Sequence, residues 1–237
     1  MKEVWADLHI HTCLSPCAER EMSPPAIVKV GRERGLHLIA ICDHNSAENV
    51  AATVRAGERA GLAVLGGMEI TSREEVHVLG IFPDDQACRS AQEVVYAHLG
   101  GRNDPETFGE QVLANERGEA VGRNDRLLIG ASGLSLEEVI GTIHRFGGLA
   151  IAAHVDRPSF SVISQLGFIP RGLGLDGVEV CSEKPPGVPE DLPVVRSSDA
   201  HRLEEIGSRR TGFLVARPTA PEIGMALRGI EGRRIVT

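Results

Sequence analysis

The chain has 237 residues, of which 42% are hydrophobic, and a formal net charge of −8. This length and apolar content suit one domain with a sizeable core, which must be built from Val, Ile, Leu and Ala because only 3% of the residues are aromatic. A negatively charged surface repels nucleic-acid backbones at long range, which argues against a broad duplex-binding role.

Seven short apolar segments have the composition and length of buried β-strands. In chain order they are Val4–Ile10, Leu38–Cys42, Ala63–Met68, Val76–Phe82, Leu149–Ala153, Gly177–Cys181 and Pro193–Arg196. Helical patterns are found at Pro24–Arg34, Ser46–Ala60, Ser135–Phe146 and Ala220–Gly229. This alternation predicts an α/β fold with a largely parallel sheet curved into a barrel.

The segment 84–133 departs from this alternation. Its first part has a helical pattern, whereas Gly100–Asp104 and Arg117–Asp125 are polar, glycine-rich and typical of loops. We interpret 84–133 as an insertion or lid within a single domain that spans residues 1–237.

The cysteines and the apolar segments bear on location. Five irregularly spaced cysteines argue against a disulfide framework. The first residues, MKEVWADLH, lead directly into a strand-like segment, and no stretch approaches the roughly 18 continuous apolar residues of a membrane helix. We expect a cytoplasmic protein with reduced thiols and no membrane partner; its oligomeric state is left open.

Six of the nine histidines fall at the ends or edges of predicted strands, and four acidic residues accompany them. The histidines are His9, His11, His44, His77, His154 and His201, and the acidic residues are Asp7, Asp43, Glu69 and Asp199. The carboxyl ends of parallel strands gather at one edge of a sheet, so these side chains can converge. Imidazole and carboxylate suit Zn, Mn or Fe, and so many groups predict a multinuclear metal centre.

Spacing supports this prediction. In HIH and DAH the two polar side chains are two residues apart, so His9 with His11, and Asp199 with His201, can each face one centre. His77 lies early in its strand, but its neighbours point to the opposite face. A lone histidine at a strand end is more often structural, and we interpret the remaining ones in that way: His37, His98 and His144.

Six motifs together resemble the PHP superfamily, which is named for polymerase and histidinol phosphatase. They are DLHIHT (Asp7–Thr12), ICDHNS (Ile41–Ser46), GGMEIT (Gly66–Thr71), VHVLG (Val76–Gly80), AAHVDRP (Ala152–Pro158) and SSDAH (Ser197–His201). Each is weak alone, but they occur in the order of the family and cover nearly the whole chain. The resemblance implies a distorted (β/α)7 barrel with a trinuclear centre of Zn, Mn or Fe at the carboxyl ends of the strands.

The resemblance also implies a ligand set. By motif, the first ion would be held by His9, His11, Glu69 and Asp199, the second by Glu69, His77 and His154, and the third by His44 and His201. Family members commonly have a further histidine at the third site, where this chain has Cys17. Cys17 is a thiolate ligand that favours Zn, or a small buried residue, or the mark of a weaker or empty site. We expect two or three divalent ions.

The resemblance further implies a metal-dependent phosphoric ester hydrolase, and we expect a small phosphorylated substrate, a phosphomonoester such as a nucleotide. Divalent ions neutralise charge on phosphate oxygens and lower the pKa of bound water, which gives hydroxide at neutral pH. Asp199 or His201 would handle the proton of that hydroxide, and Arg157 would clamp the phosphate unless it pairs with Asp156.

Residues around the ions have expected supporting roles. The carboxylates of Asp7 and Asp43 would accept a ring N–H from metal-bound histidines, which fixes the ring orientation. Ser15 would contact phosphate or belong to a turn with Pro16. Lys184 and Arg202 are weaker candidates for phosphate contact.

Three other functions compete with this one. A nuclease that acts on nucleic-acid ends is the first, although an acidic surface with few aromatic residues counts against it. A regulatory metal-binding domain without catalysis is the second, and the nearly complete ligand set counts against it. Hydrolysis of C–N bonds is the third, weakened because no lysine falls at a predicted strand end to form a bridging carbamate.

Overall fold

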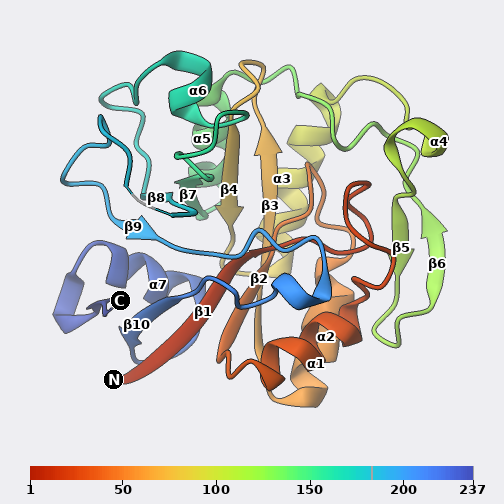
Figure 1. Cartoon of the computed structure of the whole chain (residues 1–237), viewed down its shortest axis with the longest axis horizontal. Coiled ribbons are helices and arrows are strands. Elements are labelled where there is room, and N and C mark those ends of the chain that lie inside the picture. Colours follow the sequence, from red (N-terminus) through yellow and green to blue (C-terminus); the bar gives the residue numbers. More distant parts are fainter. Residues whose placement is uncertain (183, 237) are drawn as a thin grey trace.

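A curled sheet of nine strands forms the centre of the molecule (Figure 1). The computed structural model describes residues 1–182 and 184–236. In spatial order the strands of this sheet are β11 (Arg234–Ile235), β10 (Thr211–Val215), β1 (Lys2–Ile10), β2 (Leu38–Ile41), β3 (Ala63–Thr71), β4 (His77–Ile81), β7 (Leu149–Ala152), β8 (Gly177–Glu179) and β9 (Val194–Val195).

The strand directions are mixed. Strands β1, β2 and β3 run parallel, as do β7, β8 and β9, but β4 is antiparallel to both of its neighbours and β10 is antiparallel to β1. Beyond β9 the chain forms a bridge between Ala200 and Ile10, which places the segment after β9 against β1 and closes the curl at this edge. The predicted α/β fold is confirmed in this coarse form, whereas the expectation of a largely parallel sheet is corrected at β4 and β10.

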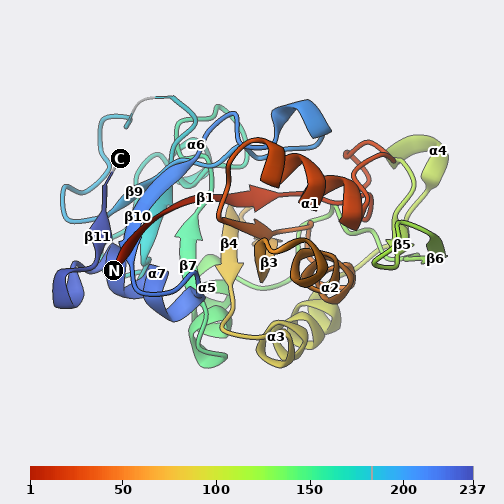
Figure 2. The ribbon, with the colours of Figure 1, turned by 90° about the horizontal axis from the view of Figure 1, so that it is seen from below.

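Helices surround this sheet. They are α1 (Pro24–Glu33), α2 (Val50–Ala60), α3 (Asp85–His98), α4 (Pro105–Phe108), α5 (Leu136–Arg145), α6 (Val162–Leu166) and α7 (Ala220–Leu227). Helix α7 packs on the inner hydrophobic cluster of the sheet through Ala220, Ile223, Ala226 and Leu227. Figure 2 shows α2, α3, α5 and α7 following one another around one side of the sheet. None of the helices in the described part of the chain combines the length and apolar character that a bilayer crossing needs.

Local sequence explains where these helices begin. Helix α5 starts with a capping box in which Ser135 and Glu138 satisfy each other's backbone N–H groups. Helix α2 was expected from Ser46 but begins at Val50, because the Ser46 hydroxyl bonds to the hydroxyl of Tyr96 instead of capping a helix.

Two hydrophobic clusters lie on the two faces of the sheet, as strand alternation requires. Ile39, Met68 and Ile70 belong to the outer cluster beneath the helices, and Leu38 and Leu79 belong to the inner cluster. Side chains that alternate with the outer cluster therefore point into the curl of the sheet. At the carboxyl ends of the strands those inward positions are polar, and the candidate site is built from them.

The segment 84–133 contributes one long helix and a hairpin. Helix α3 follows an Asp84 cap and packs against β3, which agrees with the helical pattern predicted there. The predicted loop Arg117–Asp125 instead contains β6 (Ala120–Arg123), which pairs with β5 (Val112–Ala114). All residues of β6 are exposed, so no alternation of apolar residues could reveal the strand. The hairpin stands beside α2, apart from the main sheet (Figure 1).

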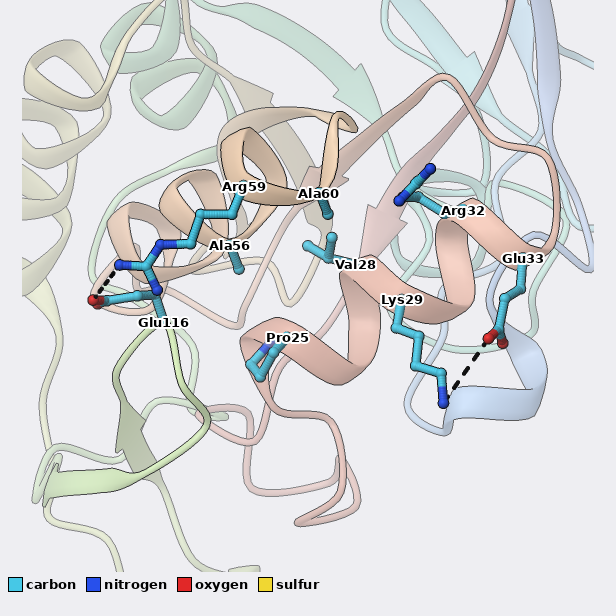
Figure 3. A pocket seen from close by; sticks show the side chains of 9 residues that line it. All are labelled: Pro25, Val28, Lys29, Arg32, Glu33, Ala56, Arg59, Ala60 and Glu116. Carbon is cyan, nitrogen blue, oxygen red and sulfur yellow. Dashed lines mark hydrogen bonds and ion pairs between the residues drawn. The ribbon is translucent and has the colours of Figure 1, made fainter.

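Ion pairs connect the hairpin to helix α2. Glu116 at its turn accepts hydrogen bonds from Arg55 and Arg59 of α2. Figure 3 shows Arg59 reaching Glu116 beside a cavity of about 490 Å³ between α1 and α2. Lys29 and Glu33 of α1 pair on the other side of this cavity. Among the residues that the structure describes, none of the donor groups suited to a metal ion lies at this cavity.

Candidate metal centre

The predicted site residues come together at one edge of the sheet. His9 and His11 are at the end of β1, Glu69 is in β3, and the others follow strands or begin one: His44 after β2, His77 at the start of β4, His154 after β7, and Asp199 and His201 after β9. His77 reaches this edge because β4 is antiparallel to β3, so its first residue pairs with Thr71 at the end of β3. A parallel strand would have carried His77 to the opposite edge.

Donor atoms form three groups, and the atoms within each group lie within 4.8 Å of one another. Among the described residues these groups are His9–His11–Glu69–Asp199, His44–Glu69–His77 and His11–His44–His201. The first group has the composition expected for the first ion. The second group lacks His154, but His154 Nε2 is 3.0 Å from Glu69 Oε1. The third group includes His11 where Cys17 was expected.

The spacing of the first group fits a bound cation. The Nε2 atoms of His9 and His11 are 3.1 Å apart, and they lie 3.2 and 3.1 Å from Asp199 Oδ1. Glu69 Oε2 is 3.5 Å from His9 Nε2 and 3.3 Å from His11 Nε2. Ligand atoms about 2.1 Å from one tetrahedral ion would be about 3.4 Å apart. The four side chains are therefore already arranged as ligands of one ion would be.

Unpaired polar atoms point to the same conclusion. In the described part of the chain, His44 Nδ1 and Asp199 Oδ1 are buried and make no hydrogen bond of good geometry, although other donor atoms of the site lie 3.0–3.2 Å away. Burying such atoms costs free energy unless a partner is present. Nitrogen and carboxylate oxygen donors are the set that Zn, Mn and Fe accept. The residues present therefore fit divalent metal ions.

Buried carboxylates set the electrostatics. Burial raises the pKa of Glu69, but the charges of His77, His9 and His44 outweigh this effect and hold that pKa well below its usual range. Burial lowers the pKa of His9, yet Asp199, Glu179 and Glu69 together raise it well above its ordinary value. The carboxylates that favour a proton on His9 would equally favour a metal cation in its place.

Glu179 is a site residue that the sequence analysis missed. Its carboxylate is buried and lies 3.0 Å from His9 Nδ1, and it also accepts the backbone N–H of His154. A carboxylate on the second ring nitrogen fixes the orientation of a histidine that binds metal through the first. The available signal was a single charged residue inside the otherwise apolar strand predicted at Gly177–Cys181.

Asp7, Asp43 and Ser15 act differently from what was expected. Asp7 accepts backbone N–H groups of Ser198, Gly207 and His9, so it holds the loop before Asp199 and bonds to no histidine ring. Asp43 reaches a ring only through Ser15, whose hydroxyl donates to Asp43 and lies 2.8 Å from His11 Nδ1. Ser15 is fully buried, which removes it as a phosphate contact.

Arg157 lies at the site, and its partner is Asp199, not Asp156. The guanidinium donates to Asp199 Oδ2, while Asp156 accepts from the backbone of Cys181 and Ser182. Burial lowers the pKa of Arg157, but Asp199 more than compensates and raises it above its ordinary value, so the charge is permanent. Arg157 lines a cavity of about 180 Å³ that opens onto Glu69, His154 and Asp199.

Cys17 lies at the rim of the centre, where it is exposed. Burial of the sulfur raises the pKa of the Cys17 thiol, but hydrogen bonds with His201 and His44 outweigh this and lower it to about 5. Cys17 is outside the third donor group, which consists of His11, His44 and His201. Its role as a ligand stays a prediction.

The remaining histidines make ordinary structural contacts. His37 Nδ1 accepts the backbone N–H of Trp5, and His98 Nδ1 is 2.9 Å from the carbonyl oxygen of Val94. His144 Nε2 is 2.9 Å from Asp176. None of the three belongs to a donor group in the described residues.

With this geometry established, comparison with known proteins identifies the family. The model of the PHP domain matches residues 7–165, which is more than half of the chain. The chain belongs to the PHP domain family. The matched range contains every site residue from His9 to His154. PHP domains and the proteins that resemble them in structure are metal-dependent hydrolases.

Three curated proteins resemble this PHP domain in sequence. Uncharacterized protein MJ1587 of Methanocaldococcus jannaschii is 28% identical over 183 residues, or 74% of this chain and 80% of the relative. A 5'-3' exoribonuclease of Haemophilus influenzae is 23% identical over 188 residues, or 62% and 68%. A phosphoribosyl 1,2-cyclic phosphate 1,2-diphosphodiesterase of Eggerthella lenta is 27% identical over 86 residues, or 34% and 32%.

Solved structures share the fold over nearly the whole chain. The lesion-specific endonuclease EndoQ of Pyrococcus furiosus superposes with a TM-score of 0.75 at 21% identity, covering 99% of this chain. An Endonuclease Q complex with a 27-mer duplex that carries an abasic lesion gives 0.74. This chain spans 58% of the length of those endonucleases, so the comparison establishes the fold alone.

Proposed function

We propose that this PHP domain is a metal-dependent phosphodiesterase that hydrolyses nucleic acid. The observation that carries the proposal is the set of three adjacent donor groups, two of which share Glu69, with Arg157 beside them in a cavity that Glu69 also lines. This arrangement suits an ester whose phosphate oxygens must be held by cations. Phosphodiesters are preferred over monoesters because the similar proteins include a ribonuclease, an endonuclease and a diphosphodiesterase, although a phosphoesterase and an amidohydrolase are also among them.

In this proposal the first ion is held by His9, His11, Glu69 and Asp199, the second by Glu69, His77 and His154, and the third by His44, His201 and Cys17. Two or three ions of Zn, Mn or Fe are expected. Bound ions would supply a hydroxide at neutral pH and neutralise charge on the phosphate. The finer description of the fold as a distorted (β/α)7 barrel stays a prediction.

Three side chains of this chain would act on the substrate directly. Arg157 would bind a phosphate oxygen with one arm of its guanidinium while the other keeps Asp199 in place. His201 is partly exposed, and its Nδ1 lies 2.9 Å from the carbonyl oxygen of Asp199. The Nδ1–H therefore donates to that carbonyl, so Nε2 is the atom that would bind the third ion or, when that ion is absent, exchange a proton with water or the leaving oxygen. Asp199 would orient the attacking hydroxide.

The sequence analysis argued against a duplex nucleic-acid partner, and this proposal replaces that expectation with a nucleic-acid substrate. That expectation rested on the net charge of −8, which describes the whole surface. Binding to phosphates depends on the local field, and Arg157 provides a permanent positive charge at the cavity. A structural neighbour also binds a 27-mer duplex. We propose that a strand of nucleic acid enters this edge of the sheet, and strandedness is an outcome of the test below.

The remaining sequence predictions accompany this proposal. We infer a single PHP domain over 1–237, with 84–133 as an insertion whose last part borders the cavity through Ile129. A cytoplasmic location also stays a prediction. Hydrolysis of a small phosphomonoester, the function first expected from the sequence, is the alternative, because a cavity of about 180 Å³ would also admit a terminal phosphate.

End-labelled oligonucleotides provide the test. RNA and DNA, each single-stranded and duplex, would be incubated with protein loaded with Mn²⁺ or Zn²⁺, beside a panel of mononucleotides assayed for phosphate release. We expect cleavage of at least one oligonucleotide, abolished by chelator. Phosphate release from mononucleotides without cleavage of any oligonucleotide would replace the phosphodiesterase with the phosphomonoesterase.

A further inference from the structure

Phe160 is an exposed aromatic side chain at the mouth of the candidate metal centre. It lines the cavity together with Arg157, Ser159 and Ile129, and 42% of its surface is exposed. The whole chain contains only six Phe, one Tyr and one Trp. The large buried side chains include Phe82 and Phe213, so Phe160 is among the few aromatic residues that the core does not use.

The backbone of Phe160 has a conformation that phenylalanine disfavours. Its φ is 56°, in the left-handed region that a bulky residue rarely adopts. The Phe160 carbonyl accepts the backbone N–H of His77, and the Ser161 hydroxyl donates to the Arg157 carbonyl, so the loop is fixed at both ends. Strained residues persist where the surroundings hold them, and they cluster at functional sites. The same loop carries Arg157.

One face of the Phe160 ring is already occupied. It stacks on the ring of His77 with centroids 4.8 Å apart and an interplanar angle of 16°. Its exposed area must therefore belong to the opposite face and the edge. Ile129 adds a second apolar side chain to the same cavity. Arg157 and a flat apolar surface thus lie side by side. This arrangement suits a ligand in which a phosphate is joined to a flat ring.

We propose that Phe160 is a stacking platform for the nucleobase beside the bound phosphate, with Ile129 as the apolar side of the same subsite. This inference rests on the proposed function, since it assigns the substrate class of that centre. Every base has a π-face, so such a platform tolerates different sequences and contributes about 1–3 kcal/mol per base. The subsite selects nucleotides over phosphoesters of aliphatic alcohols.

Binding measurements test the platform without requiring turnover. Deoxyadenosine 5'-monophosphate and 2-deoxyribose 5-phosphate share the sugar phosphate and differ in the base. Each would be titrated calorimetrically into the metal-loaded full chain of the wild type, Phe160→Ala, Phe160→Leu and Phe168→Ala. Phe168 is 61% exposed on the segment that follows the same loop, and it does not line the cavity, which makes it the matched control.

The wild type is expected to bind the nucleotide about 5- to 150-fold more tightly than the sugar phosphate. That ratio should fall to near one in Phe160→Ala, fall substantially in Phe160→Leu, which still covers His77, and stay unchanged in Phe168→Ala. An unchanged ratio in Phe160→Ala would overturn the platform, and so would an equal loss of both ligands.

The outcome is separable from that of the proposed function. Base-dependent binding that requires Phe160, with no oligonucleotide cleaved, would keep the platform and reject the phosphodiesterase. Cleavage of oligonucleotides with a Kd ratio that does not depend on Phe160 would keep the phosphodiesterase and reject the platform.

Discussion

At the scale of single residues, Glu69 and Glu179 have different roles at the candidate metal centre. Glu69 Oε1 lies 2.7 Å from His77 Nδ1 and 3.0 Å from His154 Nε2, while its Oε2 lies 3.0 Å from His44 Nδ1. Among the described residues, the Glu179 carboxylate bonds only to the far ring nitrogen of His9 and to the backbone N–H of His154. Glu69 is therefore placed to be a ligand that neighbouring ions share, whereas Glu179 orients His9, which would bind a single ion.

Replacing Glu179 tests this division. Glu179→Ala should weaken metal binding or activity about 10- to 100-fold, because His9 loses the partner that fixes its ring. Glu179→Gln keeps an oxygen acceptor and should lose less. Competition with a chromophoric chelator measures the affinity directly. Full affinity and full activity in Glu179→Ala would remove its positioning role.

Arg157 gives a second prediction at this scale. A charge-assisted hydrogen bond contributes about 1.5–3 kcal/mol, so Arg157→Ala should lower kcat/KM for the ester about 10- to 150-fold while metal content stays normal. Arg157→Lys keeps the charge but loses the forked geometry, and should recover only part of the rate. Steady-state kinetics and metal analysis on the same samples check this. Unchanged kinetics in Arg157→Ala would mean that the guanidinium serves Asp199 alone.

The sequence revealed the residues whose motifs are local and missed those that depend on the fold. His9 and His11 could be predicted as a pair because strand geometry places residues two apart on one face. Glu179 could not be paired with His9, since their contact depends on how β8 is positioned beside the rest of the sheet. Ser15 was misjudged for the same reason, because its burial against Asp43 comes from tertiary packing.

At the scale of elements, the loop after β2 bonds to the segment that forms one wall of the cavity at the metal centre. Asn45 donates to the carbonyl oxygens of Leu128 and Gly130, both at 2.8 Å, and accepts the backbone N–H of Thr71. Ile129 lies between the two bonded carbonyls and lines the cavity. Asn45 thus connects the end of the 84–133 segment to the loop that carries His44.

Two substitutions of Asn45 separate this connection from backbone strain. Asn45→Gly and Asn45→Ala both remove the three hydrogen bonds and should lower the free energy of unfolding by about 2–4 kcal/mol, because buried groups lose partners. Asn45→Ala should lose about 1 kcal/mol more, since φ at this position is 49°. Urea unfolding gives both values, and KM should rise similarly in the two variants. An unchanged KM in both would disconnect Asn45 from the cavity.

Most strands could be predicted, but their directions could not. The apolar segments that became β1, β2, β3 and β7 were recognised from composition and length alone. Nothing local distinguishes the antiparallel β4 from a parallel strand, because its direction depends on the short turn that joins it to β3. Strand β10 was missed, and it adds an antiparallel partner to β1.

At the scale of the molecule, the centre lies where the curled sheet meets itself. The backbone bonds that join β1 to the segment after β9 are His11 N–H to Ala200 O and Ala200 N–H to His9 O. Residues of the first donor group flank this junction on both sides, since Asp199 precedes Ala200. An ion bound there would link β1 to the segment after β9. Metal binding should therefore stabilise the whole fold.

Thermal unfolding measures this linkage. An ion present at about 100 times its Kd adds about 2.7 kcal/mol, and for a chain of this size each kcal/mol shifts Tm by about 2–4 °C. Chelation of the metal-loaded protein should therefore lower Tm by about 5–11 °C. Glu69→Gln should show little response to the same chelator. A Tm that is identical before and after verified metal removal would show that the fold does not depend on the centre.

The most direct test of the central claim is hydrolysis of bis(p-nitrophenyl) phosphate by protein that has been stripped of metal and then reloaded with Mn²⁺. Wild type and Glu69→Gln would be compared with measured metal content, and p-nitrophenyl phosphate would be run in parallel. We predict turnover of the diester by the reloaded wild type, none by the stripped protein, and loss of both metal and turnover in Glu69→Gln. Turnover that persists without metal, or a reloaded wild type that cleaves only the monoester, would contradict a metal-dependent phosphodiesterase.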